Sequence, residues 1–303
     1  MSGRRGPVDR PYVDRPVVDR DAALRLARLQ AAHWGLPEPI LLRHGMNALY
    51  RAGDVVLRVG HATAPAAASH EFVRRLIERG VPTVPPVEAM AADVDGFAVT
   101  GWGAVSDCGR SVDWGAVGAI VRLVHSLGVD VVPDDYPVVD PTLLPWWDFD
   151  VLLDEAEGTV DDRALAGMRS AVDRHRGWQA AVRAEPVLCH GDVHPGNVIM
   201  SASGPVLVDW DLLAFADRAW DQAMLATLAP RWGGDPAIHT AFIRGYGDPP
   251  ASPVLAATLG ELRNVAATLL RVRAAGTDAT ARPEAARRLA FWRGESTSPW
   301  SAQ

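Results

Sequence analysis

The chain has 303 residues, of which 48% are hydrophobic and 22% charged, and this balance excludes disorder of the whole chain. No run of about 18 apolar residues occurs, so a membrane-spanning helix is not expected. The formal net charge of −7 argues against a nucleic-acid partner, because phosphate backbones attract basic surfaces.

The first hundred residues predict strands with helices before and between them. Residues 1–20 are rich in proline, arginine and aspartate, which predicts a flexible tail. A helical pattern follows over 21–34, and 40–60 predicts two strands with turns at glycines. Residues 66–79 predict a second helix, and two more strands are expected between 84 and 100. We therefore expect a β-rich N-terminal lobe over residues 21–99.

Beyond the glycines at 101 and 103, the pattern becomes mainly helical. Short apolar runs broken by glycine, proline and asparagine over 187–210 predict strands around a loop, and 294–303 predicts a frayed tail. The predicted fold is α+β with two lobes, in which a hinge at 100–103 leads to a helical lobe over 104–293. The expected helices are 113–127, 161–183, 218–229, 236–245, 254–274 and 283–292.

The segment from 187 to 211 holds the most informative polar residues. Asp192 lies in a loop with two glycines and a proline, Asn197 begins one short strand, and Asp209 ends the next. A hairpin of the two strands would bring Asn197 and Asp209 together, with Asp192 facing them. Oxygen ligands of this kind suit a magnesium ion that is shared with a phosphate.

A second group of candidates lies in the first lobe. Gly45 and Asn47 sit in a turn between two strands, where exposed backbone N–H groups hold anionic oxygens. Arg58 lies in an apolar strand, and Glu71 on the following helix is a natural ion-pair partner for it. These residues predict a phosphate-binding site.

The motif His-Gly-Asp-Val-His-Pro-Gly-Asn at 190–197, with Val-Asp-Trp-Asp at 208–211 and Asp-Arg-Ala-Trp-Asp at 217–221, resembles the aminoglycoside phosphotransferase family. These small-molecule kinases have a protein-kinase-like fold and include choline, homoserine and methylthioribose kinases. Weaker similarity is found in the turn at 45–50, in Val-Leu-Arg-Val at 56–59, and in Val-His-Ser-Leu at 124–127.

The resemblance implies ATP and Mg²⁺ as cofactors and a role for each residue. Asp192 would be the catalytic base, and Asn197 and Asp209 would hold magnesium on the ATP phosphates. Arg58, paired with Glu71, would replace the family's phosphate-binding lysine, since all 30 basic residues of this chain are arginines.

The resemblance also assigns the remaining nucleotide contacts. Gly45 and Asn47 would belong to the phosphate-binding turn. The hinge around 99–103, with Val99 and Gly101, would receive adenine through backbone groups. Independently of the resemblance, Asp221 is expected to brace the loop, because helix starts commonly recruit acids, and His190 is expected to be a structural histidine that holds it.

The acceptor is less clearly indicated. Residues 146–162 hold seven acids and no arginine or histidine. In a helix, Asp150, Asp154 and Glu157 would share one face, which favours a cationic acceptor, although a solvated acidic face is the simpler alternative. The two cysteines, Cys108 and Cys189, fit a reducing compartment, so we expect a cytoplasmic protein without membrane association.

Several functions stay open at this point. The first is an antibiotic-modifying kinase that acts on an aminoglycoside-like or peptide-like antibiotic, and the second is a metabolic kinase for an amino alcohol or sugar. A pseudokinase would commonly lack Asp192, Asn197 or Asp209, but all three are present. A zinc hydrolase using His190 and His194 with Asp209 is disfavoured, because glycine and proline remove the helical spacing such a pair needs.

Overall fold

The computed structural model of the protein describes residues 17, 19–247 and 251–301. Most of the predicted tail at 1–20 therefore lies outside the described residues. The chain forms two compact units, each assembled from three separate segments. The unit that we call the sheet unit comprises Met1–Asp113, Ser126–Val139 and Gly196–Asp211. The unit that we call the helical unit comprises Trp114–His125, Asp140–Pro195 and Leu212–Gln303.

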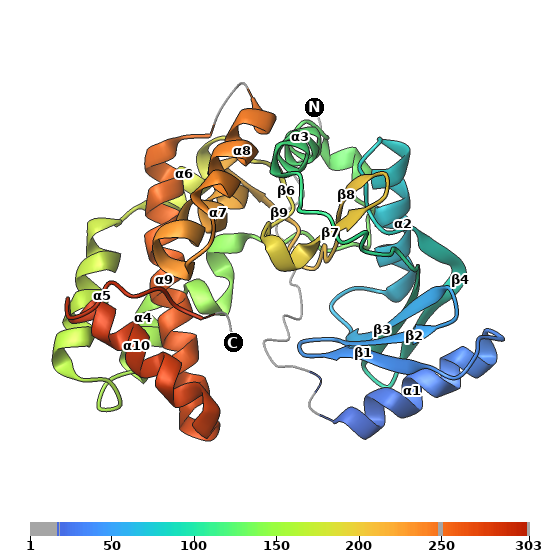
Figure 1. Ribbon diagram of the computed structural model, residues 1–303, viewed down its shortest axis with the longest axis horizontal. Coiled ribbons are helices and arrows are strands. Elements are labelled where there is room, and N and C mark those ends of the chain that lie inside the picture. Colours follow the sequence, from blue (N-terminus) through green and yellow to red (C-terminus); the bar gives the residue numbers. More distant parts are fainter. Residues whose placement is uncertain (1–16, 18, 248–250, 302–303) are drawn as a thin grey trace. The chain divides into compact units, whose positions relative to one another are not determined.

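A five-stranded antiparallel sheet forms the centre of the sheet unit, and Figure 1 labels four of its strands. The strand order is β1-β2-β3-β5-β4. The two inner hairpin strands, β2 and β3, are joined by a tight turn in which Gly53 has a φ of +64°. The strands are β1 (Ile40–His44), β2 (Ala48–Ala52), β3 (Val55–His61), β4 (Pro86–Val94) and β5 (Phe97–Gly103).

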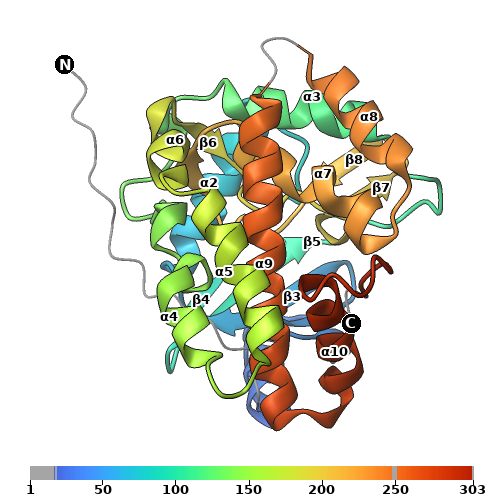
Figure 2. The same ribbon diagram turned by 90° about the vertical axis from the view of Figure 1, so that its left-hand side faces the viewer.

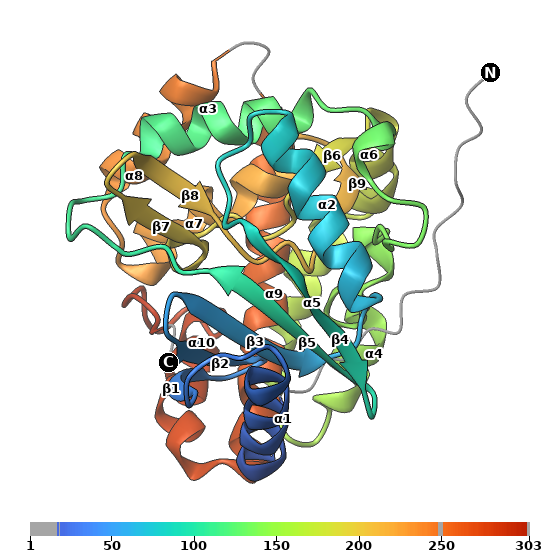
Figure 3. The same ribbon diagram turned by 90° about the vertical axis from the view of Figure 1, so that its right-hand side faces the viewer.

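The alternation of side chains in β3 gives the sheet two different faces. Leu57 and Val59 are fully buried in a core that they share with the alanine-rich face of α1 (Arg20–His33), where Ala23 and Ala27 allow close packing. Arg58 alternates with these residues and lies on the opposite face. Figure 3 shows α1 and the sheet of this unit. The core therefore occupies one face and leaves the other for polar chemistry.

The second face is completed by α2 (Ala66–Glu78) and by the hairpin of β7 (Val198–Ser201) and β8 (Gly204–Leu207). Phe72 of α2 stacks on Tyr136 and packs edge-on against Trp210. The indole N–H of Trp210 donates to Thr83 Oγ1 at 3.0 Å. These contacts join segments from three distant parts of the chain.

The helical unit is built around α9, which lies against α5 and α10 in Figure 2. Strands β6 (Val187–Cys189) and β9 (Ala214–Ala216) form a small antiparallel pair. The helices are α3 (Trp114–His125), α4 (Phe149–Glu155), α5 (Asp162–Arg174), α6 (Trp178–Ala184), α7 (Ala219–Trp232), α8 (Pro236–Tyr246), α9 (Pro253–Thr277) and α10 (Arg282–Trp292). The predicted α+β class is confirmed.

Several predicted segments differ from the structure. Residues 40–60 were predicted to hold two strands, but three strands, β1 to β3, run through them. The helix expected at 161–183 is two helices, because Gly177 adopts a φ of +86° between them. The predicted hinge at 100–103 belongs to β5, which keeps its antiparallel pairing with β3 through Gly103. The expected frayed tail is packed as far as it is described: Trp300 is 3% exposed and stacks against the guanidinium groups of Arg231 and Arg288.

Among the described residues, no helix combines the length and the apolar character that crossing a membrane requires.

The packing of α3 on α8 depends on glycine. A Cβ atom added at Gly118 would overlap the carbonyl oxygen of Phe242. We predict that Gly118→Ala lowers the free energy of unfolding by about 1–3 kcal/mol, because the helices must move apart. Gly276→Ala on α9 is the matched control, since nothing lies within 4 Å of its added methyl group. Urea denaturation of both variants tests this, and equal midpoints would contradict it.

Candidate active site

A pocket of about 300 Å³ lies within the sheet unit, on the face opposite α1. Apolar walls with a few polar groups are typical of small-molecule sites. The apolar part is lined by Leu49, Val56, Val73, Val84, Trp102, Val105, Tyr136 and Ile199. The polar part is lined by Asn47, Arg58, Asn197, Asp209 and Asp211, together with Arg43, Ser69 and Thr83.

The β7–β8 hairpin brings Asn197 and Asp209 to the same pocket. The N–H of Val208 donates to the carbonyl oxygen of Asn197 at 3.0 Å, one residue before Asp209. Asp209 has a φ of +69°, a backbone conformation that is costly for a side-chain-bearing residue and is often found at functional sites. The predicted hairpin is confirmed, and its carboxylate and amide oxygens fit the ligand preference of magnesium.

Arg58 lies among polar side chains of this pocket. Its Nη2 donates to Oδ2 of Asp211 and lies 4.0 Å from Oδ1 of Asp209. With the Asn47 amide oxygen turned toward it, that oxygen accepts from Nη2 at 2.7 Å and from Nε at 3.3 Å. Burial lowers the pKa of Arg58, but the two carboxylates raise it by more, so the guanidinium stays charged.

The predicted pairing of Arg58 with Glu71 is wrong. Glu71 instead accepts from Arg74 and, at 2.9 Å, from Arg75, which lie three and four residues later on the same helix. Asp211, the actual partner of Arg58, is separated from it by 153 residues. The second acid of Val-Asp-Trp-Asp was the available sequence signal for this contact.

Of the other residues predicted to contact the nucleotide, Asn47 lines the pocket, whereas Gly45, Val99 and Gly101 are not part of its lining. The N–H of Gly45 donates to the carbonyl oxygen of Asn47 at 3.1 Å, so the turn uses this donor itself and presents the Asn47 side chain to the pocket. Val99 is fully buried in the core beneath α1, and Gly101 lies on the same side of β5. The pocket is lined instead by Trp102 and its neighbours Gly103 and Val105.

Asp192 belongs to the helical unit, in the loop that follows β6. Its Oδ1 accepts from Arg263 Nη2 at 2.5 Å, and its Oδ2 lies 3.3 Å from His194 Nε2. Burial alone would raise the pKa of Asp192. The hydrogen bond from His194 and the charge of Arg263 lower it by more, so the pKa lies well below its ordinary value. Asp192 is therefore ionised at neutral pH.

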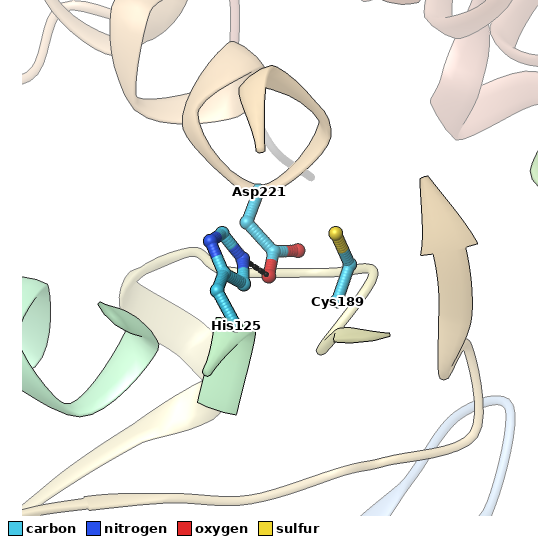
Figure 4. A group of neighbouring side chains, drawn as sticks. All are labelled: His125, Cys189 and Asp221. Carbon is cyan, nitrogen blue, oxygen red and sulfur yellow. Dashed lines mark hydrogen bonds and ion pairs between the residues drawn. The ribbon is translucent and has the colours of Figure 1, made fainter. Parts of the chain in front are cut away.

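A buried carboxylate holds this loop. Asp221 accepts from the backbone N–H of His190 at 2.8 Å and of Gly191 at 2.7 Å. Its third partner is Nε2 of His125 at 3.0 Å, and Nδ1 of that ring lies 2.8 Å from Tyr246 Oη. Figure 4 shows Asp221 and His125 pointing toward each other. The predicted bracing role of Asp221 is confirmed, and His125, which the sequence indicated only as part of Val-His-Ser-Leu at 124–127, is a further member of the brace.

Cys189 lies beside Asp221 and His125, and one ligand atom from each of the three falls within 4.8 Å of the others (Figure 4). Burial raises the pKa of the Cys189 thiol well above its ordinary value, which opposes the thiolate form that metals bind. Since the side chains of Asp221 and His125 are already hydrogen-bonded, the cluster is a structural support.

The acidic segment differs from its prediction. Helix α4 ends at Glu155, so Glu157 does not continue the face that holds Asp150 and Asp154. Arg169 of α5 contacts Glu157 and lies 3.9 Å from Asp154. Arg169 therefore compensates part of the negative charge of this segment, while Asp150 and Asp154 remain one turn apart on α4.

The fold and these residues agree with the comparison to known proteins. The chain belongs to the phosphotransferase enzyme family, whose model matches residues 47–263. It is thus a phosphotransferase, as its catalytic motif predicted. No curated protein sequence matches the chain.

Solved structures of small-molecule kinases share the fold. A spectinomycin phosphotransferase in complex with ADP and spectinomycin is 15% identical, with a TM-score of 0.65 over 90% of this chain and 98% of that one. An amicoumacin kinase bound to AMP-PNP and Ca²⁺ is 15% identical, with a TM-score of 0.64 over 93% and 96%. A choline/ethanolamine kinase family protein from Mesorhizobium loti is 20% identical, with a TM-score of 0.62 over 92% and 95%. The predicted kinase-like fold is confirmed.

The brace makes a testable contribution to stability. Burial raises the pKa of Asp221, but the bond from His125 and the two backbone donors lower it by more. The folded state therefore binds this proton more weakly than the unfolded chain. The stabilisation is complete above the ordinary aspartate pKa of about 3.9 and is lost as the pH falls through the folded value.

We predict that Asp221→Asn lowers the free energy of unfolding by about 3 kcal/mol at pH 7, because an amide cannot replace a buried carboxylate that accepts from two backbone N–H groups and from the His125 ring. The difference from the wild type should shrink as the solution is acidified below pH ~4. Asp173→Asn, which affects an exposed pair with Arg176, serves as the control. Urea denaturation at several pH values measures both, and a constant difference at all pH values would rule out the proposed linkage.

Proposed function

We propose that this phosphotransferase moves the γ-phosphate of ATP, in a magnesium-dependent reaction, to a hydroxyl group of a small molecule. The observation that carries the proposal is the joint lining of one pocket by Arg58, Asn197 and Asp209. A cation and two oxygen ligands are the set that a metal-bound polyphosphate requires. The apolar walls of the same pocket suit a nucleobase.

The magnesium ligands in this proposal are Asn197 and Asp209. Magnesium would supply charge neutralisation at the β- and γ-phosphates. Arg58 would bind phosphate oxygens with its planar fork, in place of a lysine. Because Arg58 is held by Asp211, it is already oriented before a nucleotide arrives.

Asp192 is the proposed partner of the acceptor hydroxyl. Phosphoryl transfer needs little covalent assistance, so an ionised carboxylate that orients the hydroxyl suffices for this role. The acceptor oxygen forms the bond to the γ-phosphorus, the bond from that phosphorus to ADP breaks, and the hydroxyl proton leaves through Asp192. We further propose a cytoplasmic location, where ATP is available and where free thiols such as those of Cys108 and Cys189 persist.

For the acceptor we propose an antibiotic with an accessible hydroxyl group, since spectinomycin phosphotransferase and amicoumacin kinase are among the structural neighbours. A metabolic amino alcohol is the second candidate, because a choline/ethanolamine kinase family protein shares the fold at a similar TM-score. A cationic acceptor loses its main support, since Arg169 compensates part of the acidic segment.

An acceptor panel tests the proposal. ADP release is measured with magnesium-ATP and spectinomycin, hygromycin B, amicoumacin, a macrolide, choline or ethanolamine, and the product is examined by mass spectrometry for one added phosphoryl group. We predict that Asp192→Asn cuts turnover with the active acceptor by roughly 10²–10⁴-fold, because the amide cannot take the proton. ATP affinity should stay near that of the wild type.

Asp173→Asn, an exposed aspartate of the helical unit, is the matched control and should keep wild-type turnover. Full turnover in Asp192→Asn would reject its assigned role. Nucleotide binding without ADP release for any acceptor would favour a pseudokinase over the kinase proposed here.

Arg58 gives an independent prediction. Arg58→Ala should raise the Michaelis constant for ATP by at least about 10-fold, and Arg58→Lys should raise it less, because lysine keeps the charge but loses the bidentate fork. Arg51→Ala on β2 is the control, since Arg51 pairs with Asp54 and does not line the pocket. Steady-state kinetics and calorimetric titration with ATP, with and without magnesium, measure the effect. Wild-type constants in Arg58→Ala would remove Arg58 from the phosphate site.

A further inference from the structure

Arg263 is the residue of α9 that contacts the proposed catalytic carboxylate. Its Nη2 lies 2.5 Å from Oδ1 of Asp192. The neighbouring α9 residues Leu259, Leu262 and Ala266 are buried, which fixes the direction from which the guanidinium arrives. The side chains of Arg263 and Asp192 are 22% and 25% exposed, so this pair is more shielded from water than an ordinary surface ion pair.

The two oxygens of Asp192 are held from two different elements. Arg263 contacts Oδ1 from α9, and His194 contacts Oδ2 from within the loop. Within the same loop, Nδ1 of His190 accepts from the backbone N–H of Asp192 at 3.3 Å. A carboxylate that is contacted at both oxygens has a fixed plane.

We propose that Arg263 is a positioning residue for phosphoryl transfer: it holds the Asp192 carboxylate in the orientation that receives the acceptor hydroxyl. This inference rests on the proposed function of Asp192. Arg263 touches Asp192 and acts through it. The guanidinium does not have to leave for a hydroxyl to bind, because a carboxylate oxygen can accept from more than one donor.

The charge of Arg263 also keeps Asp192 ionised. The groups that act on Asp192 are Arg263 from α9 and the loop residues His194 and His190. Removing the guanidinium removes a cation from a partly buried carboxylate, so the pKa of Asp192 should rise. Because the reaction needs the ionised form, the acid limb of the pH profile should then move to higher pH.

Three variants separate positioning from general damage. Arg263→Gln removes the charge, Arg263→Lys keeps it, and Arg273→Gln removes the same charge from the same helix ten residues away, about 15 Å along the axis. Arg273 lies 3.9 Å from Glu155 and is the matched control. At that spacing its charge is screened from Asp192 at physiological ionic strength.

We expect Arg263→Gln to lower kcat by about 10- to 100-fold with an unchanged Michaelis constant for ATP, since a misplaced catalytic group costs rate and not nucleotide binding. Arg263→Lys should recover most of the loss, and Arg273→Gln should behave as the wild type. The acid limb of kcat/KM should move to higher pH in Arg263→Gln and return in Arg263→Lys. A wild-type kcat and pH profile in Arg263→Gln would overturn the inference.

Carboxyl titration followed by carbon-13 NMR gives a readout that needs no acceptor. The Asp192 signal is identified by its loss in Asp192→Asn, and its titration should move to higher pH in Arg263→Gln but not in Arg273→Gln. If no acceptor is phosphorylated by the wild type, the proposed function fails, while this titration still tests the contact of Arg263 with Asp192. An Asp192 titration that is identical in the wild type and Arg263→Gln would overturn the inference even if the enzyme is active.

Discussion

The catalytic loop depends on one carboxylate that has no access to water. Asp221 is 1% exposed, and it accepts hydrogen bonds from two consecutive backbone N–H groups of the loop and from the ring of His125. Consecutive donors that converge on one acceptor fix the peptide planes between them. Gly191 completes this geometry with a φ of +91°, and a Cβ there would overlap the carbonyl oxygen of Leu212. The position of Asp192, one residue later, follows from these constraints.

Charge compensation by arginine is the second constraint on both units. In the sheet unit, Arg58 lies between the carboxylates of Asp209 and Asp211, which would otherwise repel each other. In the helical unit, Arg263 has the same relation to Asp192. Each of these carboxylates therefore has an arginine partner within the protein, and a ligand that binds beside them meets this positive charge as well.

The sequence predicted the parts of the molecule that depend on local patterns. Short apolar runs interrupted by glycine and asparagine predicted the β7–β8 hairpin, and the hairpin register alone brings Asn197 next to Val208 and Asp209. The α+β order of elements was predicted in the same way. The bracing role of Asp221 could be predicted because acids are commonly recruited to helix starts, and Asp221 lies in the first turn of α7.

Contacts between distant segments could not be predicted from such patterns. Glu71 was assigned to Arg58 because both belong to neighbouring elements, yet arginines on its own helix lie nearer to it. Asp211 is 153 residues from its partner Arg58, and Arg263 is 71 residues from Asp192. The local pattern of a sequence does not indicate which residues meet over such separations. The predicted strand that corresponds to β5 ended before Gly101, because glycine weakens a strand pattern. In the structure the strand continues to Gly103, since it pairs with β3 on one side and β4 on the other.

The arginine at position 58 has a chemical consequence for studying this enzyme. Nucleotide analogues that label kinases by acylating an amine beside the phosphates need a lysine that is deprotonated for part of the time. A guanidinium remains protonated and is a poor nucleophile at neutral pH, and the chain has no lysine elsewhere to react in its place. Amine-directed probes would therefore find no lysine to label in this chain, at position 58 or elsewhere.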